Sequence, residues 1–187
     1  MFPRADDSLK QTNEIGMGIP LLDTLPLNGK ILTADALLTQ RKLATYLIER
    51  GAHCVFTVKD NQPNLLGDLR LAFAQGTQPR FGQGPECAHG RIETRSMWTT
   101  TALNDYLDFP AVAQAFCIER HLVEQRTGKT SRERVYGITS HTPASANAER
   151  LLTLNRRHWC IENQLPLLRF LWVEGCPRPA EPLSWTH

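Results

Sequence analysis

The sequence predicts a mixed α/β fold built on a parallel strand–helix–strand unit. Two short runs, residues 30–33 and 54–58, are rich in β-branched and other apolar side chains, which is typical of strands. A helix-compatible stretch separates them, residues 39–50, and Gly51 closes it. A strand, a helix and a second strand at this spacing indicate two parallel strands joined by a right-handed crossover.

Asp35 follows the first of these strands almost directly. Ligand-binding groups of open α/β sheets gather at the carboxyl ends of strands, so Asp35 is a candidate site residue. Asp is also a common helix N-cap, and the sequence leaves both interpretations open.

The middle of the chain changes character. Leucines at helical spacing predict an amphipathic helix over residues 64–74, and the Gly-, Pro- and Gln-rich stretch 76–90 predicts a loop. Three strand-like runs follow, at residues 92–100, 113–124 and 133–139. The turn at 126–130 indicates that the last two form a hairpin. We therefore expect a β-rich insertion before the last helix.

That last helix is predicted by apolar residues at three- and four-residue steps, namely Leu151, Leu154, His158, Ile161, Leu165 and Leu168. Glu162 lies one turn beyond His158, at the edge of this apolar stripe. Taken alone, the helix favours reading Glu162 as an ordinary solvated residue, because Glu is usually exposed. Pro166 is expected to break or kink the helix just beyond it.

Five short motifs follow one another in a family-like order. They are T-N-E-I at 12–15, G-K-I-L-T-A-D-A at 29–36, K-D-N-Q at 59–62, H-G-R-I-E-T-R at 89–95 and H-W-C-I-E-N at 158–163. Together they resemble the transposases of bacterial insertion sequences, specifically the ISAs group of the DDE superfamily. The resemblance covers the chain from about Lys10 to Leu165.

This resemblance implies an RNase H-like catalytic domain in which three carboxylates hold two Mg²⁺ ions. The second Asp of the family corresponds to Asp35, and the family Glu corresponds to Glu162. Mg²⁺ is a hard cation that prefers carboxylate and water oxygens. Two such ions can activate a water or a 3′-hydroxyl and stabilise the leaving oxygen of a phosphodiester.

The family's first catalytic Asp has no counterpart in the sequence, because Asp6, Asp7 and Asp23 do not end a strand-like run. We therefore expect a partial RNase H-like domain that lacks the early strands and leaves one edge of the sheet uncovered. We interpret the chain as a transposase fragment that is inactive alone. The expected segments are a lead-in (1–28), the partial core (29–75), the loop and β-rich insertion (76–145), the late helix (146–172) and an irregular tail (173–187).

Charge and composition decide little. The net charge of +2 is too small to predict nucleic-acid binding by itself. Five cysteines without a C-x-x-C pair favour buried, reduced thiols over a disulfide framework or a zinc site. The sequence has no apolar run of about 18 residues and no recognisable leader, so we expect a cytoplasmic protein without a membrane partner.

DNA is the partner that the resemblance implies, with an intact transposase or a second copy of the chain as further partners. Strand alternation places Arg91 and Arg95 on one face and Arg132 and Arg134 on one face, where they could contact phosphates or simply be solvated. The candidates for DNA contact are Lys59, Arg91, Arg95, Arg132, Arg134, Arg157, His158 and Asn163. The alternative to an enzyme is a non-catalytic remnant that binds DNA or interferes with an intact transposase.

Overall fold

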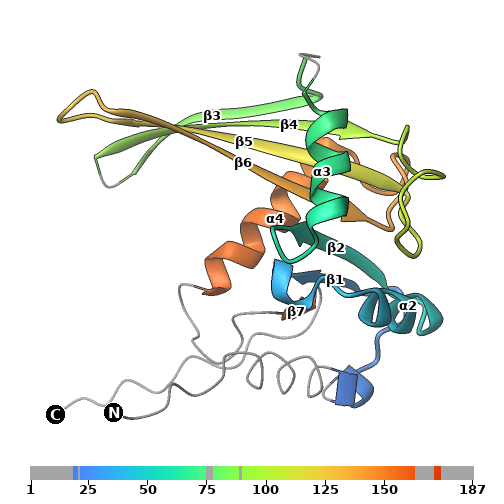
Figure 1. The fold of residues 1–187 in the computed structure, drawn as a ribbon. Helices are drawn as coiled ribbons and strands as arrows, with labels where there is room; N and C mark the ends of the chain where they lie inside the picture. Colours follow the sequence, from blue (N-terminus) through green and yellow to red (C-terminus); the bar gives the residue numbers. More distant parts are fainter. Residues whose placement is uncertain (1–18, 21, 75–77, 89, 163–170, 174–187) are drawn as a thin grey trace, which may run out of the picture.

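The structure is a computed structural model that describes residues 19–20, 22–74, 78–88, 90–162 and 171–173. Within these residues, seven strands form one sheet in the order β3-β4-β5-β6-β2-β1-β7 (Figure 1). The strands are β1 (Ile31–Ala34), β2 (His53–Val58), β3 (Phe81–Ala88), β4 (Arg91–Thr100), β5 (Gln114–Glu124), β6 (Thr130–Thr139) and β7 (Leu171–Val173). The helices are η1 (Ala36–Leu38), α2 (Arg41–Glu49), α3 (Pro63–Ala72) and α4 (Ala148–Glu162).

The predicted parallel unit is confirmed. Strands β1 and β2 pair in parallel, with Ile31 opposite His53 and Ala34 opposite Phe56, and α2 connects them. Both strands are almost entirely buried, which is why their sequences are continuously apolar rather than alternating. The predicted helix over residues 64–74 is also confirmed as α3.

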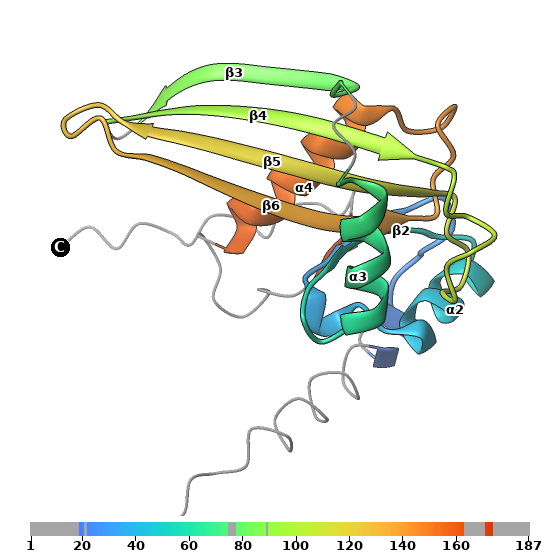
Figure 2. The same ribbon diagram turned by 45° about the horizontal axis from the view of Figure 1, so that its top comes forward.

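Helices cover the sheet on both faces. Leucines of α2 and α3 pack on one face against Phe56 and Cys117. On the other face, Leu151 and Leu154 of α4 pack against Val55 and Phe116. Figure 2 shows α3 and α4 on opposite sides of the sheet. None of the described helices is both long and apolar enough to cross a membrane.

The β-rich segment belongs to the same sheet as the parallel unit, because β6 pairs antiparallel with β2. The predicted hairpin is confirmed, since β5 and β6 pair antiparallel across the turn at 125–129. The three strands β4, β5 and β6 continue past the carboxyl end of β2 as a long antiparallel arm (Figure 1).

The loop predicted over residues 76–90 is wrong, because Phe81–Ala88 forms the edge strand β3. Gly82, Gly84 and Pro85 suggested a loop. At an edge, however, a proline removes no ladder hydrogen bond that the sheet needs. The register shifts between Gln83 and Glu86, and Gly84 has a φ of +125° at this irregularity.

The expectation of an uncovered sheet edge beside β1 is also wrong. Strand β7 pairs antiparallel with β1, with Leu32 opposite Val173 and Ala34 opposite Leu171. Residues 171–173 were expected to end the late helix and begin the irregular tail, and they are strand. Of the cysteines with described side chains, Cys54 and Cys117 are buried as expected, whereas Cys87 is exposed.

Gly137 lies where β6 passes closest to its neighbours. A Cβ at this position would lie 2.1 Å from the Phe116 ring and 2.5 Å from the Phe56 carbonyl oxygen. Both neighbours are fully buried, so a Cβ at this position would fit only if one of them shifted.

We therefore expect Gly137→Ala to lower the free energy of unfolding by about 3 kcal/mol, because overpacking a filled core displaces its neighbours. Urea unfolding measures the effect. Gly82→Ala is the matched control, since a Cβ there meets nothing within 4 Å, and it should change stability by less than about 0.5 kcal/mol. Equal effects of the two substitutions would contradict the described packing.

Two stacked histidines lie at the amino end of β2. The rings of His53 and His141 are 4.1 Å apart, and His141 Nδ1 lies 3.1 Å from the Ser145 hydroxyl. His141 Nε2 is buried without a hydrogen-bond partner. Burial, with a further contribution from the nearby charges of His53 and Arg150, lowers the pKa of His141 to about 4.

Because the unfolded chain binds a proton on this histidine near pH 6.5 and the folded protein does so only near pH 4, the unfolded state takes up more protons between these values. Stability should therefore be complete above about pH 6.5 and fall as the pH drops toward 4. Urea unfolding at several pH values measures this slope. His141→Asn should reduce the slope, and an unchanged slope would refute the role of His141.

Candidate functional site

Asp35 lies at the carboxyl end of β1, between Ala34 and the short helix η1. It occupies the N-cap position of η1, but its side chain makes no capping hydrogen bond. Instead, an Asp35 carboxylate oxygen lies 3.1 Å from the Lys59 ammonium. The Asp35 side chain is 23% exposed, so it can still reach a ligand from solvent.

The loop after β2 holds the turn that follows Asp35. Asn61 Nδ2 donates to the Ala36 carbonyl at 2.6 Å, and Gln62 Nε2 donates to the Thr39 carbonyl at 3.1 Å. The Thr39 hydroxyl in turn donates to the Thr57 carbonyl at 2.6 Å. The K-D-N-Q motif therefore fixes the backbone around Asp35, a role that the sequence did not suggest. Lys59, predicted to contact DNA, forms an ion pair with the candidate acid.

Helix α4 crosses this end of the sheet and brings His158 to β1. His158 Nδ1 and the Thr33 hydroxyl are hydrogen-bonded at 3.0 Å, and both residues are buried. His158 Nε2 is buried without a partner among the described residues. Burial lowers the pKa of His158, while the Asp35 charge raises it and the Lys59 charge lowers it. This helix turn therefore lies within electrostatic reach of the Asp35–Lys59 pair.

Glu162 is the last residue of α4, one helical turn beyond His158. The Glu162 side chain and the whole of Asn163 lie outside the described residues. The predicted approach of the Asp35 and Glu162 carboxylates therefore stays a prediction.

An ion-pair network holds α4 to the edge of the sheet. Arg156 makes two hydrogen bonds of 2.9 Å to the Glu86 carboxylate, which also accepts one from Arg95 at 3.0 Å. The hydrogen bonds from Arg156 hold the pKa of Glu86 below its ordinary value. Sequence reasoning missed Glu86 because it lies in the stretch predicted as a loop.

The arginines proposed for DNA contact divide between the two faces of the sheet. Arg95 pairs with Arg120 in register and faces α4, whereas Arg134 pairs with Glu119 and faces the other side. Both form ion pairs: Arg95 with Glu86 and Glu93, and Arg134 with Glu119.

The other DNA-contact candidates differ in exposure. Arg91, Arg132 and Arg157 are exposed, and their role in binding stays a prediction. His158 is only 5% exposed, which does not favour a DNA contact, and its role in binding stays a prediction.

The described side chains do not by themselves make a magnesium site. Among them, no three His, Cys, Asp or Glu residues lie close enough together to hold a metal ion. Asp35 supplies one hard oxygen donor of the kind that Mg²⁺ prefers, and Lys59 occupies it.

Comparison with known proteins identifies distant relatives of the chain, although no protein-family model matches it. It is 34% identical over 140 residues to an uncharacterized protein in the dhlA 3′ region of Xanthobacter autotrophicus, covering 71% of this chain and 46% of that protein. It is 30% identical over 173 residues to the putative protein YbfL of Escherichia coli K12, covering 83% of the chain and 43% of YbfL. Over the same length and with the same coverage, it is 28% identical to the H repeat-associated putative transposase YhhI of that organism.

These relatives connect the α/β protein with proteins named as transposases. The chain is a distant homologue of proteins named H repeat-associated putative transposases. It spans less than half the length of the relatives it matches.

The Thr33–His158 hydrogen bond is testable through stability. Thr33→Val preserves the shape of the side chain but leaves the buried His158 Nδ1 without its partner, so the free energy of unfolding should fall by about 1–3 kcal/mol. Thr130→Val, at an exposed strand position, is the control and should change stability by less than about 0.5 kcal/mol. If urea unfolding gives the two variants the same stability, α4 is not held to β1 through this bond.

Proposed function

We propose that the chain is part of the catalytic domain of a DDE-type transposase, in which Asp35 and Glu162 are two of the metal-binding carboxylates. The observation that supports this proposal best is the contact between α4 and β1. Through His158 and Thr33, that contact brings the helix that ends at Glu162 to the strand that Asp35 directly follows. The transposase names of distant homologues support the same reading.

The residues around Asp35 have separate tasks in this proposal. The hydrogen bonds from the side chains of Asn61 and Gln62 fix the backbone next to the Asp35 carboxylate. His158, buried and with its pKa lowered, supports the helix as a neutral group rather than acting as an exposed acid. Lys59 balances the Asp35 charge and has to give way to a cation that binds there. When bound, Mg²⁺ would activate a water or a 3′-hydroxyl for attack on a phosphodiester.

Two carboxylates hold a metal pair less firmly than three, because fewer negative charges balance the repulsion between the two cations. Asp35 and Glu162 are the acids of this chain that match the resemblance, and its first Asp has no match in the sequence. Losing one member of a catalytic unit removes most of its activity. We therefore expect a protein made of these residues alone to bind divalent cations weakly and not to cleave DNA. It would then act only by binding DNA or by pairing with an intact transposase.

Binding of Mn²⁺, followed by electron paramagnetic resonance, tests the site. We expect weak binding that Asp35→Asn and Glu162→Gln each abolish. Asp60→Asn is the matched control, because Asp60 follows Lys59 but its side chain is 94% exposed, and it should leave the binding unchanged. Mn²⁺ binding that survives Asp35→Asn would exclude Asp35 as a ligand and overturn the proposed site.

Strand cleavage of element-end DNA with Mg²⁺ or Mn²⁺ tests the expected inactivity separately. The parent chain and an Asp35→Ala variant should both give background signals. Metal-dependent cleavage by the parent that disappears in the variant would show an active enzyme and refute the inactivity.

A further inference from the structure

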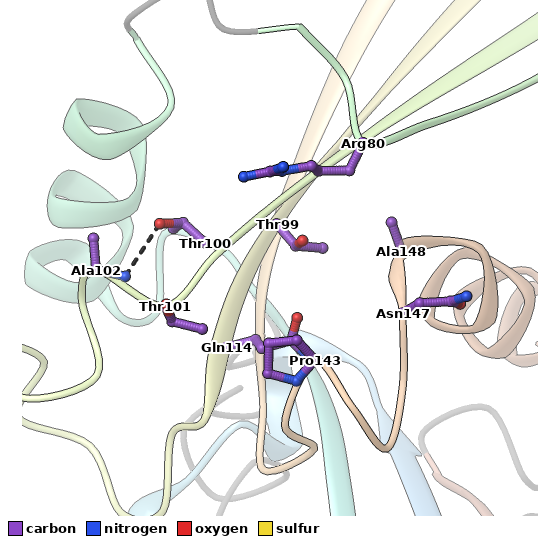
Figure 3. A pocket seen from close by; sticks show the side chains of 9 residues that line it. All are labelled: Arg80, Thr99, Thr100, Thr101, Ala102, Gln114, Pro143, Asn147 and Ala148. Carbon is purple, nitrogen blue, oxygen red and sulfur yellow. Dashed lines mark hydrogen bonds between the residues drawn. The ribbon is translucent and has the colours of Figure 1, made fainter.

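A cavity of about 510 Å³, lined by both polar and apolar groups, lies at the end of the sheet where α4 begins. It opens between the end of β4 and the start of α4, and Figure 3 shows the side chains that line it. The lining consists of one guanidinium group, several hydroxyls and amides, and three small apolar groups. Its members are Arg80, Thr99, Thr100, Thr101, Ala102, Gln114, Pro143, Asn147 and Ala148.

Arg80 is the charged residue of this lining. Its backbone N–H donates to the Met97 carbonyl at 2.8 Å, which fixes the residue beside the end of β4. Its side chain extends across one side of the cavity, with Asn147 and Ala148 on the other side (Figure 3). Unlike Arg95 and Arg156, which share Glu86, Arg80 has no carboxylate partner among the described residues. The positive charge of Arg80 is therefore not paired with a carboxylate among the described residues.

Hydroxyl-bearing residues also line this cavity. They are Thr99, Thr100 and Thr101, and the Thr100 hydroxyl accepts a hydrogen bond from the Ala102 N–H at 3.2 Å (Figure 3). The first turn of α4 begins at Ala148 and contains Glu149, whose carboxylate already supplies the negative charge that a helix start favours. Asn147 Oδ1 already accepts from the Arg150 N–H at 2.9 Å, so the start of α4 is capped and ordered without a ligand.

Hydrogen bonds of a buried side chain also fix the shape of the cavity. Gln114 is buried at 1% exposure, and its amide donates to the carbonyls of His141 and Ala146 at 2.8 and 3.0 Å. These bonds tie the loop that leads into α4 to the first residue of β5. A preformed site costs less ordering on binding than one that must assemble.

We infer that this cavity seats one backbone phosphate of a DNA strand, with Arg80 as the charged contact and the threonine hydroxyls as neutral donors. A phosphate fits because it is an acceptor on all sides and pairs well with a guanidinium, while no carboxylate lines the described cavity to repel it. The inference rests on the proposed function for its choice of DNA.

The position of the cavity fits a strand that runs along α4. The cavity lies at the first turn of this helix, and Glu162 is its last residue, so the two lie about 21 Å apart at 1.5 Å per residue. Arg150 and Arg157 are both exposed on α4 and seven residues apart, which places them on one side of the helix. A strand that contacts the cavity and this side of α4 would reach the Asp35 end of the sheet.

Binding of a labelled oligonucleotide, followed by fluorescence anisotropy over a series of salt concentrations, tests the inference. We expect Arg80→Ala to weaken binding about tenfold, because it removes a charge-assisted hydrogen bond, and to reduce the salt dependence by about one released counterion. Arg126→Ala is the matched control: Arg126 is exposed in the β5–β6 turn, at the far end of the arm, and its loss should leave affinity unchanged. Unchanged urea midpoints in both variants would show that the fold is intact.

Amide chemical shifts of Thr99, Thr100 and Thr101 distinguish the sources of phosphate. Shifts produced by the oligonucleotide in the parent and lost in Arg80→Ala support a DNA contact. Shifts produced only by inorganic phosphate would overturn the DNA assignment and leave a site for a free anion. No shift with either probe, or equal DNA affinity in the parent and Arg80→Ala, would overturn the cavity as a phosphate site. Mn²⁺ binding at Asp35 is measured independently, so failure of this inference can be told from failure of the proposed function.

Discussion

The crossing of α4 over β1 is the contact on which the candidate site depends. Thr33 and His158 lie far apart in the sequence, and a hydrogen bond between their buried side chains joins them. A buried polar group without a partner is costly, so this bond favours one position of the helix along the strand. The apolar packing of Leu151 and Leu154 supplies most of the attraction, but it does not specify that position as closely. The Glu86–Arg156 pair then restrains the same helix from the opposite edge of the sheet.

The two faces of the sheet serve different purposes. Helices α2 and α3 close one face over the parallel strands, where the chain builds its larger core. The other face carries α4, the ion-pair network and both ends of the region that we connect with DNA. The antiparallel arm of β4, β5 and β6 extends from this body, and its polar residues are joined mainly to one another across strands.

Much of the fold follows from local sequence signals, and most of the site does not. The apolar runs around Leu32 and Phe56, with Gly51 ending the helix between them, are sufficient to predict the parallel unit. Strand β3 could not be predicted, because an edge position tolerates Gly84 and Pro85 and only the completed sheet makes it an edge. The ion pair of Lys59 with Asp35 joins the residues that directly follow two paired strands, so it depends on the parallel register.

Strand alternation has a related limit. It predicts which residues of one strand share a face, but it cannot tell whether residues of different strands lie on the same face of the sheet. Arg95 and Arg134 therefore proved to lie on opposite faces only once the register was known.

The ion pair at Asp35 has a consequence for how the protein folds. An isolated carboxylate at the end of a buried strand would be a charge that folding must dehydrate, and many metal proteins remain unfolded until a cation compensates such groups. Here Lys59, which directly follows β2, lies beside Asp35 once β1 and β2 pair. It is therefore an internal counter-ion for the Asp35 carboxylate. In the proposed function, formation of the sheet would therefore not depend on divalent ions, and a cation would bind only after the sheet has formed.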